Sequence, residues 1–326
     1  MEVIQVSDRP ASQSFYEVAG RLLFIESVDL RLDNLIERLF AGWQLAPVSL
    51  PDRSPDIRIQ FFCGALPEIP QNLDRFEIAE GGQCYTAGAD LYLALGNALV
   101  HVQNGSAGVW VSGLPGLRDP FLARAASFAV CAALRRHGLF ELHGAGMVHP
   151  ESEKGVLIIG PSGSGKSTLA VQLAMSGWPY LSDDEVLLSL VDGVVEARGF
   201  RSFFALRSES SGNFKNCFEP DLAFESTRRS SAVPGVLLFI SLTGEEKTRL
   251  DRLTQTKTMM RLLSACPWAA YDTAIAAPNL DLLSRLARQT RAFDLFASRD
   301  LLTPGFASHL LSMYLNTEVD PTLPRL

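Results

Sequence analysis

Residues 155–175 read GVLIIGPSGSGKSTLAVQLAM, and this stretch decides the fold class. It opens with a short apolar run, Val156 to Ile159, which has the composition of a buried strand. A loop rich in glycine and serine follows, and an Ala- and Leu-rich segment typical of a helix runs from the loop to about Met175. Residues 160–167 match the pattern G-x-x-x-x-G-K-S/T in the strand–loop–helix context that gives the pattern its meaning. The stretch therefore predicts an α/β fold whose loop binds a nucleoside triphosphate.

The residue types in this loop suit the binding of phosphate. Glycines allow backbone angles that turn successive N–H groups toward phosphate oxygens, and the start of the helix adds the positive end of its dipole. Lys166 supplies a full charge to the β- and γ-phosphates, and Ser167 offers a hydroxyl to Mg²⁺. A turn of this composition can also match by chance, but here the strand, loop, Lys, Ser and helix occur in order. We expect ATP and Mg²⁺ as cofactors, and we expect the nucleotide to contact Gly160, Ser162, Gly163, Ser164, Gly165, Lys166, Ser167 and Thr168.

Two further features near the loop are able to carry chemistry. Asp183 and Asp184 follow a strand-like stretch, residues 178–182, soon after the loop helix. Two carboxylates beside a Mg²⁺–triphosphate can divide two tasks, because one steadies the metal or its water and the other accepts a proton from an attacking hydroxyl. His143 lies on the strand that precedes the loop strand, where an imidazole can orient or tune an acidic residue. Taken alone, adjacent acidic residues also cap helices, and a single histidine at a strand end is commonly structural.

Composition limits the class of protein. The chain has 326 residues, 47% of them apolar and 20% charged, which is the balance of a globular protein of one large or two ordinary domains. A net charge of −7 argues against a general nucleic-acid-binding protein, which normally has a basic face. The five cysteines and five histidines lack metal-ligand spacing, so no zinc site is expected. Without a signal segment or an apolar run long enough to span a membrane, the cytoplasm is the expected compartment and no membrane partner is expected.

The pattern along the chain indicates two domains. Residues 14–26 predict a strand, a glycine turn and a second strand, residues 30–43 predict a helix, and alternating residues between 56 and 111 predict a series of further strands. The cluster of Gly and Pro at residues 113–116 then breaks the pattern, so we expect an N-terminal α+β domain, rich in antiparallel strands, over 1–116 and a second domain over 117–326. In the second domain we expect helices near 120–136, 257–264, 280–291 and 306–314, strands at 139–148, 155–159, 235–242 and 292–297, and a mobile loop or lid at 208–231.

The order of these motifs resembles the catalytic domain of the HPr kinase/phosphorylase family. The resemblance covers about residues 141–190, which carry His143-Gly144, the phosphate loop, a helix that ends before Gly177, and the Asp-Asp pair. It implies a phosphate-loop fold of the HPr kinase/PEP carboxykinase-like type. It also implies that Asp183 acts as the general base toward a serine hydroxyl with His143 close by, that Asp184 lies nearer the metal, and that Lys166 takes part in catalysis.

The sequence also departs from this family. The family has a metal-binding carboxylate before an arginine, whereas the matching segment here is Phe203-Phe204-Ala205-Leu206-Arg207, with Ala205 at the position of the carboxylate. Arg207 is expected to contact phosphate, and Glu209 is a possible substitute for the missing carboxylate. The family's C-terminal substrate segment is not present, so HPr itself is not the expected acceptor.

Two hypotheses remain open. The first is an ATP-dependent kinase that transfers the γ-phosphate to a serine-type hydroxyl of a protein, a peptide or free serine. The second is a regulatory or scaffolding protein that binds the nucleotide with little or no phosphate transfer, which the alanine at position 205 favours. The N-terminal domain carries no motif with chemistry; recognition of the acceptor and formation of a homo-oligomer are the roles expected for it.

Overall fold

The structure is a computed structural model that describes residues 12–49, 51–78, 82–113, 120–207, 215–218, 223–224 and 226–316. The chain forms two compact units, one made of Met1–Phe140 with Trp268–Asn279 and the other of Glu141–Pro267 with Leu280–Leu326. The boundary expected after residue 116 falls among residues 114–119, which lie outside the described part. The helix expected at 120–136 belongs to the first unit by its contacts, and so does a short segment from much later in the chain.

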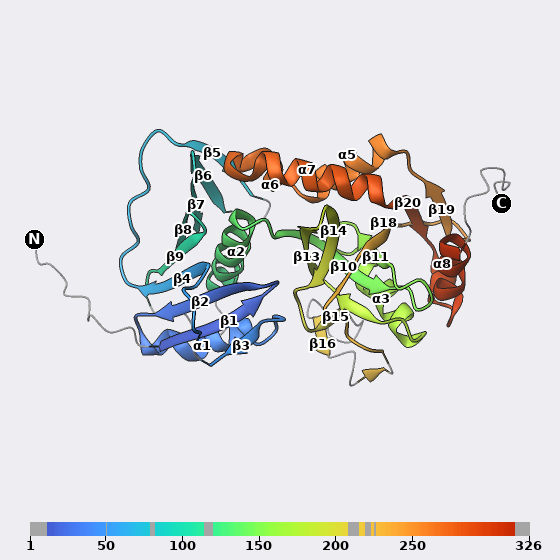
Figure 1. The fold of residues 1–326 in the computed structure, drawn as a ribbon, viewed down its shortest axis with the longest axis horizontal. Coiled ribbons are helices and arrows are strands. Elements are labelled where there is room, and N and C mark those ends of the chain that lie inside the picture. Colours follow the sequence, from blue (N-terminus) through green and yellow to red (C-terminus); the bar gives the residue numbers. More distant parts are fainter. Residues whose placement is uncertain are drawn as a thin grey trace, which may run out of the picture. The chain divides into compact units, whose positions relative to one another are not determined.

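A mixed sheet forms the first unit, in the strand order β3-β1-β2-β4-β9-β8-β7-β6-β5 (Figure 1). Neighbouring strands are antiparallel except for β4, which runs parallel to both β2 and β9. This agrees with the expected α+β unit rich in antiparallel strands. The strands are β1 (Ser12–Val18), β2 (Arg21–Ser27), β3 (Ala46–Val48), β4 (Ile57–Cys63), β5 (Asp74–Glu77), β6 (Gln83–Ala87), β7 (Asp90–Leu95), β8 (Ala98–Gln103) and β9 (Ser106–Val111).

Two longer helices accompany this sheet, α1 (Leu30–Phe40) and α2 (Pro120–Arg136). The apolar residues of α1 recur at helical spacing, and Leu32, Leu35 and Ile36 are buried, so one face of the helix packs against the sheet. Helix α2 packs against β8 and β9, and its small alanines allow the close approach that this packing requires. Both helices confirm the sequence prediction.

Packing of a distant segment completes the first unit. The short helix α6 (Trp268–Tyr271) and the first residues of α7 (Thr273–Gln289) join it. The indole ring of Trp268 lies edge-on to the ring of Phe128, with centroids 5.4 Å apart. The Arg136 guanidinium donates to the Asp272 carboxylate over 2.6 Å, and both side chains are almost fully buried. Residues 268–279 are therefore anchored by aromatic packing and a buried ion pair, two contacts that local sequence patterns do not reveal.

The second unit contains another mixed sheet, in the order β17-β14-β13-β10-β11-β18-β20-β19, with β12 paired to β10. Strands β11, β18 and β20 are parallel, whereas β10 pairs antiparallel with β11. A separate hairpin joins β15 to β16. The strands are β10 (Phe140–Val148), β11 (Gly155–Ile159), β12 (Tyr180–Ser182), β13 (Glu185–Val191), β14 (Val194–Gly199), β15 (Phe204–Arg207), β16 (Lys215–Phe218), β17 (Ser231–Ala232), β18 (Pro234–Leu242), β19 (Arg249–Arg252) and β20 (Arg291–Ala297).

The core of the second unit explains its apolar strands. On β18, Val236 and Leu238 belong to one apolar cluster together with residues of α3 and α8, while Leu237, on the opposite face, is buried as well. A strand buried on both faces has a nearly continuous apolar sequence rather than an alternating one. The helices of this unit are α3 (Lys166–Met175), α5 (Gln255–Ala265), the rest of α7, a 3₁₀ turn η2 (Arg299–Leu302) and α8 (Phe306–Asn316).

Most of the predicted elements of this unit are confirmed, with some differences. The expected hairpin between β10 and β11 is present, and α3 ends before Gly177, whose positive φ suits a C-terminal cap. Helix α7 begins several residues earlier than expected and contains Pro278. Half of the expected mobile loop at 208–231 lies outside the described residues, and its described half includes β16 and the start of β17. No helix among the described residues is long and apolar enough to cross a membrane.

His149 generates a prediction about stability. It is fully buried at the end of β10, its Nδ1 accepts the Ser152 N–H over 3.2 Å, and its ring lies edge-on to Trp178. Burial lowers the pKa of His149 below its ordinary value of 6.5. His149 therefore binds a proton more readily in the unfolded chain than in the folded one. Its contribution to the free energy of unfolding should be constant above pH 6.5 and fall as the pH drops below that value. Each unit of pKa depression corresponds to about 1.4 kcal/mol.

Urea unfolding at pH 7.5 and pH 5.0 measures this effect, and His149→Gln removes the titrating group. We expect the wild type to lose more unfolding free energy between these pH values than the variant does. His137, whose pKa burial also lowers, is present in both proteins and cancels in the comparison. Equal losses of unfolding free energy in the wild type and in His149→Gln would show that His149 is not the group responsible.

Candidate functional site

The glycine-rich loop (residues 160–165) joins β11 to α3 and has a backbone that glycine makes possible. Gly163 and Gly165 have φ angles of 83° and 98°, a region that disfavours other residues. At Gly160 the constraint is space, because a Cβ atom there would lie 2.6 Å from Ser164 Oγ and 2.7 Å from Ile240 O. Gly163 and Gly165 thus allow the chain to turn, and Gly160 allows the loop to approach β18.

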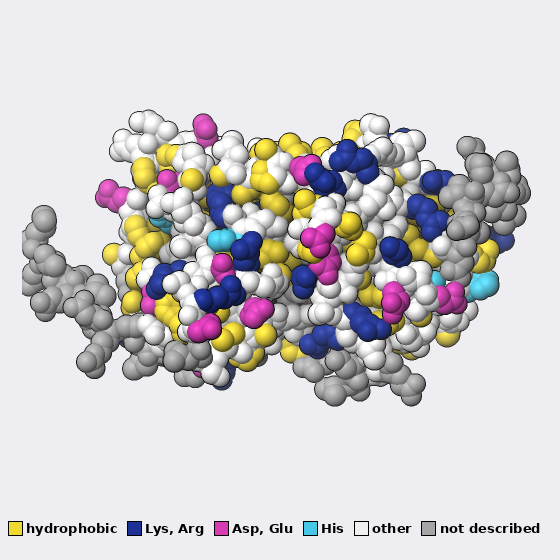
Figure 2. All heavy atoms as spheres, in the orientation of Figure 1, with side chains coloured by type: hydrophobic (Ala, Val, Ile, Leu, Met, Phe, Trp, Pro, Cys, Tyr) yellow, Lys and Arg dark blue, Asp and Glu magenta, His cyan; other side chains and the backbone are white. Residues whose placement is uncertain are grey.

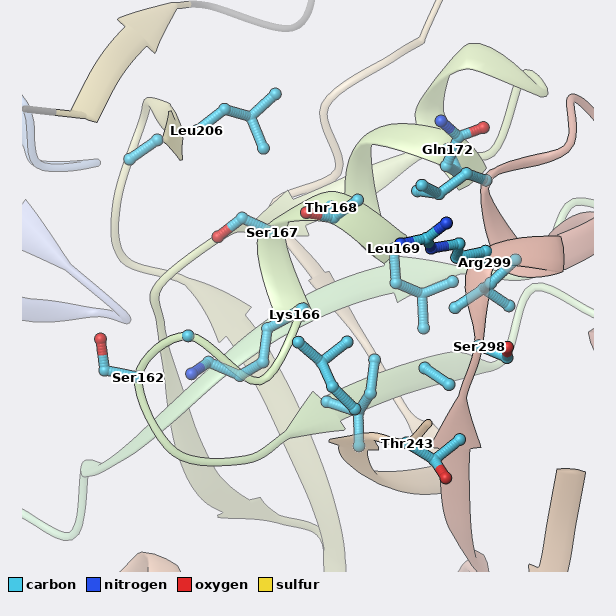
Figure 3. A pocket seen from close by; sticks show the side chains of 18 of the residues that line it. Ser162, Lys166, Ser167, Thr168, Leu169, Gln172, Leu206, Thr243, Ser298 and Arg299 are labelled. Carbon is cyan, nitrogen blue, oxygen red and sulfur yellow. The ribbon is translucent and has the colours of Figure 1, made fainter. Parts of the chain in front are cut away.

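Lys166, the first residue of α3, folds back across this loop. Its Nζ donates to Gly160 O over 2.7 Å and to Pro161 O over 3.1 Å, and only 6% of the residue is exposed. Figure 3 shows its side chain extending toward the part of the loop that carries Ser162. The ammonium group is therefore held at the loop, where an anion bound by the loop amides would meet its charge.

His143 stands next to this lysine and links it to an acidic residue. Its Nε2 lies 3.1 Å from Lys166 Nζ. Because an ammonium group only donates hydrogen bonds, Nε2 accepts and the ring proton belongs on Nδ1. Nδ1 faces Asp184 Oδ1 at 3.6 Å, and both side chains are about half exposed. Lysine, imidazole and carboxylate thus form a continuous polar row beside the loop.

The strand order explains why these residues meet. Gly144 on β10 pairs with Ile159 on β11, so His143 lies opposite the start of the glycine-rich loop. The Gly144 N–H also donates to Asp184 O over 3.0 Å, which fixes the turn between β12 and β13 beside His143. Strand β12 is antiparallel to β10 and therefore runs in the same direction as β11. The carboxyl ends of β12 and β11 lie at the same edge of the sheet, as the sequence analysis expected for the acidic pair.

Asp183 is oriented differently from its neighbour. It is 1% exposed, and its Oδ2 accepts the Ala205 N–H over 2.9 Å at the start of β15. The resemblance implied that His143 lies close to Asp183, and in the structure His143 Nδ1 faces Asp184 Oδ1. The two residues lie in the bend between β12 and β13, where Asp183 bonds to β15 and Asp184 lines the cavity.

A cavity of about 460 Å³ opens beside the loop and is large enough for a nucleotide-sized ligand. Lys166 lies toward one part of it, and Gln172 and Arg299 lie together in another part (Figure 3). Leu242 and Leu302 in its wall are 65% and 51% exposed, which is unusual for leucine and leaves apolar surface facing the cavity. The lining consists of His143, Ser162, Gly163, Gly165, Lys166, Ser167, Thr168, Leu169, Gln172, Asp184, Ala205, Leu206, Ile240, Leu242, Thr243, Ala297, Ser298, Arg299, Leu301 and Leu302.

Not every expected site residue reaches this cavity. Gly160 and Ser164 belong to the loop but do not line the cavity, and Ser164 is buried. The backbone of Arg207 ends β15, whereas its side chain and all of Glu209 lie outside the described part. Ala205 lines the cavity, so no carboxylate faces it from that position.

Sequence analysis missed Thr243, Ser298 and Arg299, which also line the cavity. Thr243 follows β18, and the other two follow β20. Both strands are parallel to β11, and the carboxyl ends of parallel strands meet at one edge of a sheet. The polar residues directly after predicted strands 235–242 and 292–297 were therefore a usable signal.

The oxygen atoms that line the cavity are suitable ligands for a hard cation such as Mg²⁺ that is also bound by phosphate. The Ser167 hydroxyl and the Asp184 carboxylate line the same cavity, and oxygen ligands are what Mg²⁺ prefers. The described residues contain no group of three or more His, Cys, Asp or Glu side chains that could hold a metal ion without further ligands. A metal at this site would therefore complete its coordination with oxygen atoms of a bound ligand or of water.

Comparisons with known proteins give similarities among solved structures. No protein-family model matches the chain, and no curated protein matches it. Among solved structures, it is similar to the HPr(Ser) kinase/phosphatase from Coxiella burnetii, with 12% sequence identity and a TM-score of 0.34 over 54% of this chain and 90% of that one. A similarity this low says nothing about the chemistry of the site, which must be argued from the geometry of its residues.

Gly144 generates a prediction about the site's construction. A Cβ atom at this position would lie 2.7 Å from Ile158 O, so Gly144→Ala should push β10 away from β11. We expect a loss of about 1–3 kcal/mol in unfolding free energy, as is usual for overpacked cores. Urea denaturation measures it. Gly244→Ala is the matched control, because nothing lies within 4 Å of its Cβ position. Equal stability of the two variants would contradict the close approach.

Proposed function

We propose that this chain binds a nucleoside triphosphate in the cavity beside the glycine-rich loop and transfers its γ-phosphate to a serine-type hydroxyl. The observation that carries the proposal is the polar row Lys166–His143–Asp184, which borders the same cavity as the loop. A site for binding alone needs the loop and the lysine. The half-exposed carboxylate oriented by an imidazole supplies the additional group that phosphate transfer to a hydroxyl needs.

In this proposal the loop and Lys166 hold the phosphates. The loop amides and the start of α3 face the β- and γ-phosphate oxygens, and Lys166 exchanges its carbonyl partners for them. The base and ribose of the nucleotide lie toward Leu242 and Leu302, whose exposed side chains would be covered by the ligand. Gln172 and Arg299 also line the cavity and offer polar groups to the ligand.

Asp184 accepts the proton of the acceptor hydroxyl in the proposed reaction. The hydroxyl oxygen forms a bond to the γ-phosphorus, the bond from that phosphorus to the bridging oxygen breaks, and the hydroxyl proton passes to Asp184. A general base must reach the hydroxyl directly. Asp184 is 44% exposed at its side chain whereas Asp183 is buried, so the base is assigned to Asp184 and not, as the resemblance implied, to Asp183. His143 positions Asp184, and Asp183 holds β15 through Ala205.

The Ser167 hydroxyl is the protein ligand assigned to Mg²⁺. When bound with the triphosphate, the ion neutralises charge on the β- and γ-phosphate oxygens. Ser167 occupies the first turn of α3, next to Lys166, and lines the cavity. The second candidate function, nucleotide binding without transfer, is favoured by Ala205, which offers no carboxylate to a metal where the resembled family has one.

Two matched variants test the assignment of the base. Asp184→Asn should reduce the transfer rate about 10²–10⁴-fold, the usual contribution of a general base, with little change in nucleotide affinity. Asp183→Asn keeps an oxygen that can accept the Ala205 N–H and should retain most of the activity. Loss of transfer in Asp183→Asn alone, in a folded protein, would return the base to Asp183.

A titration of Mg²⁺ separates the base from a metal ligand. If Asp184 bound the metal, as the resemblance implied, Asp184→Asn would need a higher Mg²⁺ concentration and would recover activity there. Our assignment instead expects the lost rate to persist at saturating Mg²⁺.

Transfer of label from γ-labelled ATP tests the function as a whole. Free serine, serine-containing peptides and phosphocarrier proteins are offered as acceptors, and Lys166→Met is the negative control. Loss of a charged donor to phosphate costs about 1.5–3 kcal/mol, so the variant should bind ATP about 10–100-fold more weakly. Lys257→Met, which removes an exposed charge on α5, should bind normally. Tight binding of ATP without transfer to any acceptor would favour the regulatory function.

A further inference from the structure

A small polar pocket of about 220 Å³ lies at the start of β20, away from the large cavity, which lies at the end of the same strand. Strand β19 and the beginning of α5 contribute to it, as do the end of α7 and the start of β20. Three arginines, Arg252, Arg288 and Arg291, share this pocket, although the protein as a whole carries a net charge of −7. Arg252 and Arg288 are exposed and Arg291 is partly buried, and an anion between such like charges would be attracted by all three.

The acidic residues on the same elements do not serve this pocket. On β19 the carboxylate of Asp251 pairs with Arg249, and on α7 Asp281 pairs with Arg285. On β20 the partner of Asp294 is Arg261, at 3.0 Å. Many basic side chains on the face drawn in Figure 2 likewise lie beside acidic ones.

Two of the three pocket arginines, unlike the basic residues just described, are not paired with a carboxylate of the described residues. Neither Arg252 nor Arg288 forms an ion pair with a carboxylate in the described part of the chain. Arg291 donates to Leu315 O over 3.0 Å, which holds its guanidinium in place. Burial lowers the pKa of Arg291, and the positive charge of Arg252 lowers it further. The guanidinium groups of Arg252 and Arg291 are therefore close enough to repel each other.

We propose that this pocket binds a small phosphate-class anion, either inorganic phosphate or a phosphomonoester. Guanidinium groups match the geometry of phosphate oxygens, and each can donate two hydrogen bonds to them. Gln255, the first residue of α5, also lines the pocket, so the positive end of that helix adds to the attraction. The volume is below the roughly 300–1,000 Å³ of sites that enclose drug-sized ligands, which fits a small anion better than a nucleotide.

The proposed anion site is independent of the nucleotide proposal. Four residues of β20, Phe293–Phe296, lie between Ala292 of the small pocket and Ala297 of the large cavity, which are about 16 Å apart along an extended strand. Phosphate bound in one pocket cannot contact the other, so variants distinguish the two sites.

Thermal unfolding and calorimetric titration test this site, with inorganic phosphate as the probe against chloride at equal ionic strength. The background is Lys166→Met, which weakens phosphate binding at the glycine-rich loop. We expect phosphate to raise the Tm of this protein, and we expect Arg252→Gln with Arg288→Gln to weaken phosphate binding at least tenfold. Arg285→Gln is the matched control, because that residue lies on α7 but pairs with Asp281. It should respond to phosphate as the background does.

An unchanged phosphate response in the double variant would overturn the proposal, as would no response in the background protein. Circular dichroism shows whether the double variant is folded. If it is not folded, Arg252→Gln and Arg288→Gln are tested singly, and each should weaken phosphate binding in part. Titration with glycerol phosphate identifies the source of the anion, since tighter binding than that of inorganic phosphate indicates a phosphomonoester.

Discussion

The pairing of β10 with β11 at Gly144 is the contact on which the rest of the site depends. Gly144 lies opposite Ile159, the last residue before the glycine-rich loop, and the absence of a side chain lets the strand approach Ile158 O. The N–H group of the same residue binds Asp184 O. One glycine therefore joins the strand that enters the loop to the turn that carries the acidic pair, and it places His143 between them.

The electrostatics of the site follow from this arrangement. Lys166 cannot accept a hydrogen bond, so its contact with His143 fixes which nitrogen of the ring carries the proton and directs that proton toward Asp184. Asp183, one residue earlier, points into the protein, where the Ala205 N–H compensates part of its loss of water. Two neighbouring carboxylates thus have different environments, and only one faces the cavity.

Local patterns in the sequence predicted most strands and helices and the glycine-rich loop, because alternation, helical spacing and glycine turns are local properties. They did not predict that residues 268–279 join the first unit, since that depends on the ion pair between Arg136 and Asp272 and on the packing of Trp268. Hairpin β15–β16 was missed for a related reason. Its strands are short, and the segment between them is polar and gives no periodic signal.

The same distinction applies to the site. The loop was predictable because its residues are consecutive, whereas Arg299 reaches the cavity through the order of the strands in the sheet. The Asp-Asp pair is held by hydrogen bonds from residues far away in sequence, because the Gly144 N–H binds the backbone oxygen of Asp184 and the Ala205 N–H binds the side chain of Asp183. The resemblance to a family supplied a role for each acid, and our proposal exchanges these two roles.

The absence of a carboxylate at Ala205 is compatible with phosphate transfer for a reason that lies in the reaction. In a loose transition state the bond to the leaving oxygen is largely broken before the acceptor oxygen loses its proton, so the position of the base matters more than its strength. In our proposal Asp184 meets that requirement, because its carboxylate lines the cavity and faces His143. A missing metal ligand would weaken the hold on Mg²⁺, which the triphosphate oxygens themselves can offset, whereas Asp184 is the one carboxylate that lines the cavity among the described residues.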